Sequence, residues 1–341
     1  MQVVRGNRRK PGQKIKYIWW FCLWLMICLM TVWAVSAIWV IQPPSTLRIM
    51  AVVSYLLGAL LPPLVLRPRW RGAAVSTVLF GCVLVWFLNL SPSNNRDWQP
   101  DLAVLPWAEI TGDKIVLHNI RNCDYRTETD FTCHYYDRVL DLAKLQGVDL
   151  FLVYWGSPHI AHTMLSFGFE EGDTVCFSIE TRKEMGENYS AFKGFFRQYE
   201  KIYVMADERD LVRLRTNYRH EDVYLYRLRV KPETARKVFL DYLREMNRLK
   251  DQPDWYNALT ANCTTSIRQH TVPYNPEARL DWRLIINGYI DQMIYERGGF
   301  SSDLSFTALK EASYINKKAQ AAGQSADFSR LIREGLPELS R

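Results

Sequence analysis

Three long apolar stretches lie in the first ninety residues, and they constrain the fold more than any other feature of this sequence. They run from Tyr17 to Ile41, from Leu47 to Leu66 and from Gly72 to Leu90, and Arg48 is the one charged residue within them. At 1.5 Å per residue, each stretch is long enough to cross a hydrocarbon core of about 30 Å. We therefore predict three transmembrane helices within residues 17–90.

Two other interpretations of these stretches are possible. The first stretch resembles a signal peptide, but it is long for one and no small-residue cleavage site precedes Gln42-Pro43-Pro44. Two of the three stretches could form a buried helical hairpin, but the chain offers no soluble segment long enough to cover them. Membrane spans remain the better prediction.

The distribution of charge predicts an orientation. Ten of the 43 Lys and Arg residues and none of the 36 Asp and Glu residues lie in positions 1–90. Basic residues occur in the tail 1–16 and at Arg67, Arg69 and Arg71, whereas the loop 42–46 has no charge. The positive-inside rule then places the tail and the second loop in the cytoplasm, and residues 91–341 outside it.

Residues 91–341 are long enough for one domain with its own core. They carry 33 basic and 36 acidic residues, so the overall net charge of +7 belongs to the membrane section. A domain that is slightly acidic gives no reason to expect a nucleic acid as a partner.

Periodicity predicts a mixture of helices and strands in this domain, with an antiparallel sheet packed on helices. We expect strands over 107–110, 114–120, 149–155 and 224–230, and helices over 135–144, 207–218, 232–249 and 280–295. The last forty residues are polar and weakly patterned.

The strongest local pattern is a β-hairpin, with strands over 161–169 and 174–182 around the turn 170–173. If the turn is centred on Glu171, residue 162 lies opposite residue 180. His162 and Glu180 would then be neighbours on the more polar face of the hairpin, where Ser178 is also expected.

Cys263 stands at the predicted start of a short helix, after a possible Asn262 cap and before Pro273. Free backbone N–H groups and the helix dipole favour a thiolate at that position. His162 could take the thiol proton, and Glu180, or Ser178 as second choice, could orient the imidazole. Cys263 therefore has the surroundings that a nucleophile needs, although a single buried cysteine is more often inert.

Three other cysteines lie in the domain. Cys123 and Cys133 flank a short polar loop and are the candidate disulfide, although two reduced thiols fit the spacing equally well. Cys176 lies in the middle of a strand, which favours a small core residue. We expect a solvated helix face, rather than a site for an anionic headgroup, at Arg213, Arg215 and Arg219.

Several segments, in order along the chain, resemble the Lnb N-terminal periplasmic domain family. They are Pro106-Trp107, Ile120-Arg121-Asn122, Ile160–Phe167, Ser178–Arg182, Ala206–Asp210, Tyr256-Asn257 and Asn262–Thr265. The resemblance implies a bacterial cytoplasmic (inner) membrane protein with a periplasmic catalytic domain of the circularly permuted papain-like type. It also implies that Cys263 is the nucleophile and His162 the base. We expect Asn262, Tyr256 and Arg182, which lie in these motifs, to contact the substrate.

The leading hypothesis is a membrane-tethered acyltransferase that carries an acyl group from a phospholipid or lipoprotein to an amine as a Cys263 thioester. The alternatives are a Cys–His peptidase or amidase that acts on cell-wall peptides, and a non-catalytic binding domain. The sequence predicts membrane lipid as a partner, together with a lipoprotein or a cell-wall peptide. It predicts no metal and no cofactor.

Overall fold

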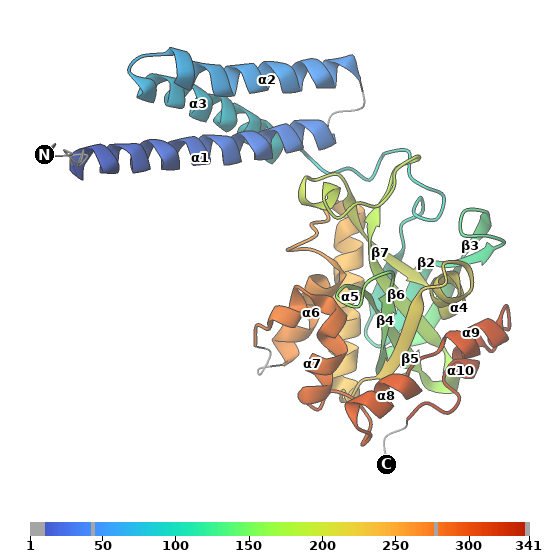
Figure 1. Cartoon of the computed structure of the whole chain (residues 1–341). Coiled ribbons are helices and arrows are strands. Elements are labelled where there is room, and N and C mark those ends of the chain that lie inside the picture. The colour runs from blue at the N-terminus through green and yellow to red at the C-terminus, as the bar shows by residue number, and fades with distance from the viewer. Residues whose placement is uncertain (1–10, 42–44, 276–278, 338–341) are drawn as a thin grey trace, which may run out of the picture. The chain divides into compact units, whose positions relative to one another are not determined.

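A computed structural model of the chain describes residues 11–41, 45–275 and 279–337. The chain forms two compact units, Met1–Ser91 and Pro92–Arg341 (Figure 1). The first contains three helices, α1 (Pro11–Ile41), α2 (Thr46–Val65) and α3 (Arg69–Leu88). By length and composition all three could cross a membrane, over Lys16–Ile41, Thr46–Val65 and Arg69–Leu88. The basic residues before Pro11 and residues 42–44 of the first loop lie outside the described part of the chain.

Close packing joins α2 and α3 near the loop with the arginines. Gly72 lies against Pro62 and Pro63, and a Cβ atom at Gly72 would come within 2.3 Å of the Pro62 carbonyl oxygen. The buried Ser76 hydroxyl donates to the Ala59 carbonyl oxygen at 2.6 Å, so its polar group is satisfied inside the helix pair.

The second unit contains strands and helices in both halves of its sequence. The strands are β1 (Trp107–Thr111), β2 (Lys114–Tyr125), β3 (Phe131–Asp141), β4 (Leu145–Tyr154), β5 (Ala161–Phe169), β6 (Thr174–Arg182), β7 (Glu200–Ala206) and β8 (Asp222–Arg227). The helices are α4 (Glu208–Arg213), α5 (Pro232–Asp251), α6 (Cys263–Thr271), α7 (Ile290–Glu296), α8 (Phe306–Ala312), α9 (Asn316–Ala322) and α10 (Phe328–Leu331).

All eight strands join one sheet in the order β1-β2-β7-β6-β5-β4-β8, and β3 also pairs with β2. The pairing is antiparallel except between β2 and β7, which are parallel. The predicted combination of membrane helices and a helix-plus-sheet domain is confirmed. The sheet itself is mixed, which corrects the expectation of a purely antiparallel one.

Helices cover both faces of this sheet (Figure 1). On one face, the apolar side of α5 packs with Leu165, Phe167, Phe177 and Ile179, and Cys263 belongs to this core. On the other face, α4, α9 and α10 pack against Met164, Cys176 and their neighbours. Because both faces are covered, the strands in the middle of the sheet are buried over most of their length.

The predicted hairpin is confirmed with its register. β5 and β6 have the expected bounds, and Met164 lies opposite Ser178. The same register, continued by two residues, places His162 opposite Glu180. The turn contains Glu171 with a φ angle of 66°, as tight turns require.

Two predicted helices are wrong. Residues 135–144 form most of β3 and a short turn, because the aromatic and β-branched residues there pair with β2. Residues 280–295 form two single turns and then α7. The Gly288 N–H donates to the His159 carbonyl at 3.0 Å, and a Cβ at Gly288 would lie 2.1 Å from the Pro158 oxygen. This close approach takes Gly288 out of a regular helix.

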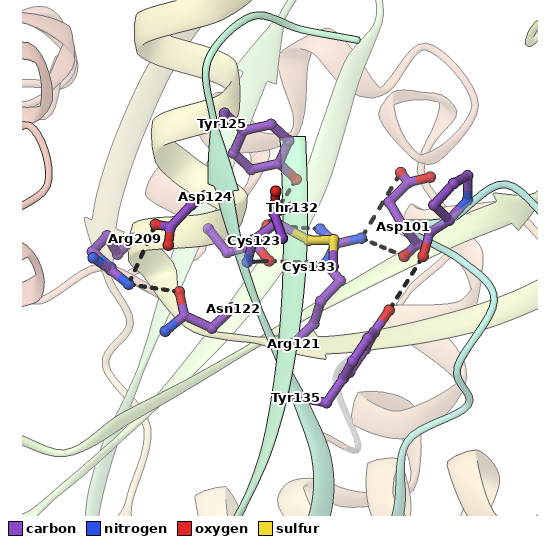
Figure 2. Close-up of a disulfide and its surroundings, with 12 residues drawn as sticks. Asp101, Arg121, Asn122, Cys123, Asp124, Tyr125, Thr132, Cys133, Tyr135 and Arg209 are labelled. Carbon is purple, nitrogen blue, oxygen red and sulfur yellow. Dashed lines mark hydrogen bonds and ion pairs between the residues drawn. A yellow bond between two sulfur atoms is a disulfide. The ribbon is translucent and has the colours of Figure 1, made fainter. Parts of the chain in front are cut away.

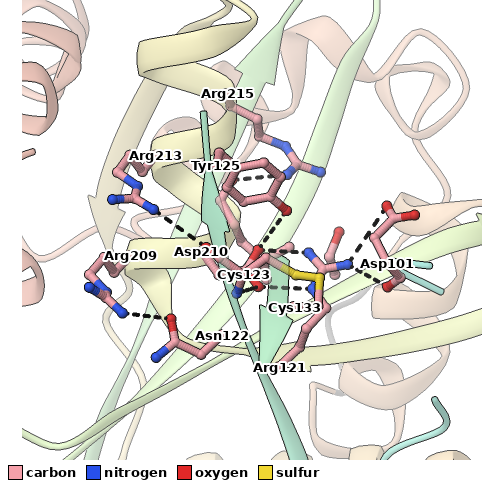
Figure 3. Close-up of polar contacts among 12 residues, drawn as sticks. Asp101, Arg121, Asn122, Cys123, Tyr125, Cys133, Arg209, Asp210, Arg213 and Arg215 are labelled. Carbon is pink, nitrogen blue, oxygen red and sulfur yellow. Dashed lines mark hydrogen bonds and ion pairs between the residues drawn. A yellow bond between two sulfur atoms is a disulfide. The ribbon is translucent and has the colours of Figure 1, made fainter. Parts of the chain in front are cut away.

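Cys123 and Cys133 lie opposite each other on β2 and β3 and form a disulfide (Figure 2). The disulfide joins the two strands of the β2–β3 hairpin near the loop that connects them. Next to it, Arg121 and Tyr125 face the first turn of α4 (Figure 3). The disulfide and α4 therefore belong to one structural region.

Candidate active site

Cys263 is the first residue of α6, as the sequence predicted. The Asn262 side chain accepts from the Thr265 N–H at 2.9 Å, and the Thr265 hydroxyl accepts from the Asn262 N–H at 2.9 Å. This reciprocal capping box fixes the start of the helix. The first N–H groups of a helix have no partner further along it, so they can stabilise negative charge on or near the sulfur.

The thiol of Cys263 is buried, with 7% of the residue exposed. Burial alone raises the pKa of the thiol. The charge of His162, a hydrogen bond from His162 and hydrogen bonds from Thr163 outweigh burial and lower the pKa to about 6. A pKa of about 6 favours the thiolate form of Cys263 at neutral pH.

Hydrogen bonds indicate which nitrogen of the neutral His162 ring carries the proton. The Ser178 hydroxyl donates to Glu180 Oε1 at 2.7 Å. Because a hydroxyl has one proton, Ser178 must accept from His162, whose Nε2 lies 2.7 Å away. Nε2 therefore carries a proton in the neutral ring, and Nδ1 is the nitrogen that can take the thiol proton.

Glu180 thus reaches His162 through Ser178. The direct separation between His162 Nε2 and Glu180 Oε1 is 3.9 Å, longer than a hydrogen bond. Sequence reasoning named Glu180 and Ser178 as alternatives for the third group. The structure places them in series instead.

Arg215 is a residue of this site that sequence reasoning missed. It lies on the π-helical segment Leu214–Tyr218 that continues α4, it is buried, and its guanidinium donates to Glu180 Oε1 at 2.9 Å. Burial raises the pKa of Glu180, but Arg215, His162 and Arg121 together bring it well below its usual range. The expectation of a solvated arginine face is therefore wrong for Arg215 and for the equally buried Arg213.

The three residues expected to contact substrate have different places. Tyr256 is buried beside Cys263, and its hydroxyl is hydrogen-bonded to that of Tyr189. The Asn262 amide caps α6 and donates to the Ala258 carbonyl at 2.9 Å. Of the three, Tyr256 is the one whose hydroxyl has its pKa raised by the charge of Cys263.

Arg182 has a structural role away from the dyad. Its buried guanidinium donates to the carbonyl oxygens of Leu102 and Ala103 at 2.9 and 2.8 Å, and it lies 4.3 Å from the centre of the Trp98 ring. It anchors the chain where it enters the domain. The structure thus does not bring Arg182 together with the other expected substrate contacts.

Metal chemistry has no obvious site in the part of the chain that the structure describes. Within those residues, no group of three or more His, Cys, Asp or Glu side chains is arranged to hold a metal ion. The titratable groups that the site brings together are a thiol, an imidazole and a carboxylate.

The fold and the site define an α+β domain with a buried thiol–imidazole pair, preceded by helices that could span a membrane. Residues 131–288 match the family described as the Lnb N-terminal periplasmic domain, which is the family that the sequence motifs resemble. The match includes His162, Glu180 and Cys263. Together with the apolar helices it fits an inner-membrane protein with a periplasmic, membrane-associated domain. No curated protein and no solved structure gives a significant match to the chain.

The lowered pKa of Cys263 predicts how its alkylation depends on pH. The rate constant for iodoacetamide should rise with the thiolate fraction and reach half its plateau near pH 6. Peptide mass spectrometry can compare Cys263 with Cys176, whose pKa burial raises well above its usual value. Cys176 should stay unmodified up to pH 8. A midpoint near pH 9 for Cys263 would contradict an interaction between its thiol and His162.

Proposed function

We propose that the protein is a thiol-dependent acyltransferase of the bacterial inner membrane. The observation that supports this most directly is the reduced pKa of Cys263 at a helix start beside His162. A nucleophile, a base and free helix amides are the parts that acyl transfer through a covalent intermediate requires. The chain order, with His162 before Cys263, is that of permuted papain-like enzymes.

The proposed first half-reaction forms a thioester. The Cys263 thiolate attacks the carbonyl carbon of an acyl ester, and the first amides of α6 stabilise the oxyanion. The C–O bond of the ester then breaks. His162, protonated at Nδ1, gives its proton to the departing alkoxide, which leaves as an alcohol, and the acyl group stays on sulfur.

The second half-reaction transfers the acyl group to an amine. The neutral His162 takes a proton from the amine as its nitrogen attacks the thioester carbonyl. The C–S bond breaks, an amide forms, and Cys263 returns as a thiolate beside an imidazolium. Ester and amine are thus converted to alcohol and amide, and no oxidant or metal is needed.

The membrane supplies the context for this reaction. We propose that the N-terminus and the loop with Arg67 are cytoplasmic and that the domain is periplasmic. The acyl donor would be a phospholipid or a lipoprotein, and the acceptor the amine of a lipoprotein. An acyl donor held in the bilayer explains why a catalytic domain would be tethered to three helices.

The test uses the full chain in nanodiscs that contain phospholipid with an isotope-labelled acyl chain. The expected result is an acyl adduct on the Cys263 peptide that neutral hydroxylamine removes, with none on Cys176. The Cys263→Ala variant should carry no such adduct. Cleavage of cell-wall peptides without an adduct would replace this proposal with the peptidase alternative. If the wild type forms no adduct and ligand binding survives Cys263→Ala, the result would support the non-catalytic binding domain.

A further inference from the structure

A group of large apolar side chains is exposed between β6 and β7 and in the turn before α6. Five side chains, each between 45% and 55% exposed, form this group, which we call the apolar rim: Met185, Tyr189, Phe192, Phe195 and Leu259. The two segments are in contact, since the Ala258 N–H donates to the Gly194 carbonyl at 3.2 Å. An exposed apolar cluster of this kind marks an interaction surface.

The apolar rim lies next to the candidate nucleophile. Tyr189 shares a hydrogen bond with Tyr256, and the charge of Cys263 acts on both of these hydroxyls. Leu259 belongs to the turn that Asn262 holds through its bond to Ala258. A molecule bound to the rim would therefore be close to the sulfur of Cys263.

The apolar rim is also fixed to the segment through which the chain enters the domain. The Met185 N–H donates to the Asp97 carbonyl at 2.7 Å, and the Gln99 amide donates to the Glu187 carbonyl at 2.7 Å. Figure 1 shows the entering chain and the segment between β6 and β7 at the same end of the sheet.

The chain between the third apolar helix and the domain is short. The third apolar helix ends at Leu88, and the Ser93 N–H is already bonded to the buried Glu200 at 3.0 Å. The five peptide units between Leu88 and Ser93 reach at most about 18 Å. Whatever the arrangement of the two units, Ser93 stays within that distance of the end of the span.

We propose that the apolar rim docks the domain on the bilayer, with its side chains inserted among the lipid acyl chains. Aromatic and long aliphatic side chains are the residues that membrane interfaces take up. The docking itself does not depend on catalysis. Its consequence, that an acyl ester reaches Cys263 directly from the bilayer, rests on the proposed function.

The test is photolabelling of the full chain in nanodiscs that contain a phosphatidylcholine with a diazirine in its acyl chain. Peptides covering 184–197 and 256–262 should carry lipid adducts, in addition to those on α1, α2 and α3. The reference is the β3 peptide that contains Val139, an apolar side chain that is 61% exposed. Val139 lines a depression together with Glu171. Glu171 is in the turn of the β5–β6 hairpin, at the end opposite to the apolar rim. Labelling of the rim no higher than that of β3 would overturn the proposal.

Two variants sharpen the result. Phe192→Ser combined with Phe195→Ser should lower adducts on the rim by about fivefold or more, because the apolar contact area is reduced, while adducts on α1 to α3 stay unchanged. Val139→Ser should change neither. If the double variant does not fold, the wild-type comparison with β3 still decides.

Docking and catalysis can fail separately. Cys263→Ala should be labelled at the rim like the wild type, because labelling needs no thiol. Rim labelling without a Cys263 acyl adduct would overturn the acyltransferase alone. An acyl adduct without rim labelling would overturn the docking alone.

Discussion

Replacement of His162 by Gln is expected to slow the acylation of Cys263 by roughly 10²- to 10⁴-fold, the usual contribution of a positioned general acid and base. The reason is twofold. His162 is the largest of the influences that lower the pKa of the thiol against burial, and it is the group that would protonate the leaving alcohol. The measurement is the initial rate of acyl adduct formation in nanodiscs.

The same variant should shift the alkylation midpoint of Cys263 upward. With His162 removed, burial is opposed mainly by the Thr163 hydrogen bonds, so the midpoint should move from near pH 6 to pH 9 or above. The midpoint is a better readout than the rate at one pH, because a more basic thiolate is also intrinsically more reactive.

His159→Gln provides a matched control for His162→Gln. His159 lies three residues earlier, and its Nδ1 is 2.7 Å from the hydroxyl of Tyr289. Its replacement should leave the midpoint of Cys263 where the wild type has it. An unchanged midpoint in His162→Gln, or an equal shift in both variants, would show that His162 does not act on the thiol.

Local sequence patterns predicted most of the structure that positions His162 and Cys263. The β5–β6 hairpin and its register could be predicted because alternating apolar residues flank a recognisable turn. The start of α6 could be predicted because Asn262 is a favourable N-cap residue directly before Cys263, and the structure adds Thr265 as the second half of a capping box. Both features depend on residues that are close together in the sequence.

The parts that could not be predicted depend on distant contacts. Arg215 reaches Glu180 across 35 positions of sequence, and no local pattern distinguishes it from a solvated arginine. Gly288 interrupts a helical pattern because it meets the segment before β5. The weakly patterned C-terminal segment forms α8, α9 and α10, and Ile315, Ala319 and Phe328 fill the core on the second face of the sheet.

The contact between Arg215 and Glu180 depends on how α4 is held, and Asp210 holds it. Asp210 is fully buried in the first turn of α4. Its carboxylate accepts from Arg121 at 2.8 and 2.9 Å, from the Cys123 N–H at 2.8 Å and from the Tyr125 hydroxyl at 3.1 Å (Figure 3). This one side chain joins α4 to β2 beside the disulfide.

Replacement of Asp210 by Asn is expected to destabilise the domain by about 3–5 kcal/mol, the usual cost of leaving one partner of a buried ion pair. Burial lowers the pKa of Arg121, but Asp210 more than offsets this, and the pKa stays well above its usual value. An arginine keeps its proton inside a protein even without a partner, so Arg121 remains charged in the variant. For a domain of this size the loss corresponds to a fall of roughly 6–20 °C in the melting midpoint.

The matched control for Asp210→Asn is Asp130→Asn. Asp130 also forms a carboxylate–arginine pair, with Arg126, but both side chains are more than half exposed. Water and salt screen such a pair, so this variant should melt with the wild type. The measurement is thermal unfolding of the full chain in detergent, followed by near-ultraviolet circular dichroism.

A double variant identifies the cause of the loss in Asp210→Asn. If an unpaired charge is responsible, adding Arg121→Met should restore part of the stability, because the buried guanidinium is then gone. The recovery should be incomplete, since the Cys123 N–H and the Tyr125 hydroxyl still lack their charged acceptor. If Asp210→Asn melts with the wild type instead, Asp101 must satisfy Arg121. The Arg121 Nη1 atom already lies 2.8 Å from the Asp101 carbonyl oxygen and 4.0 Å from its carboxylate.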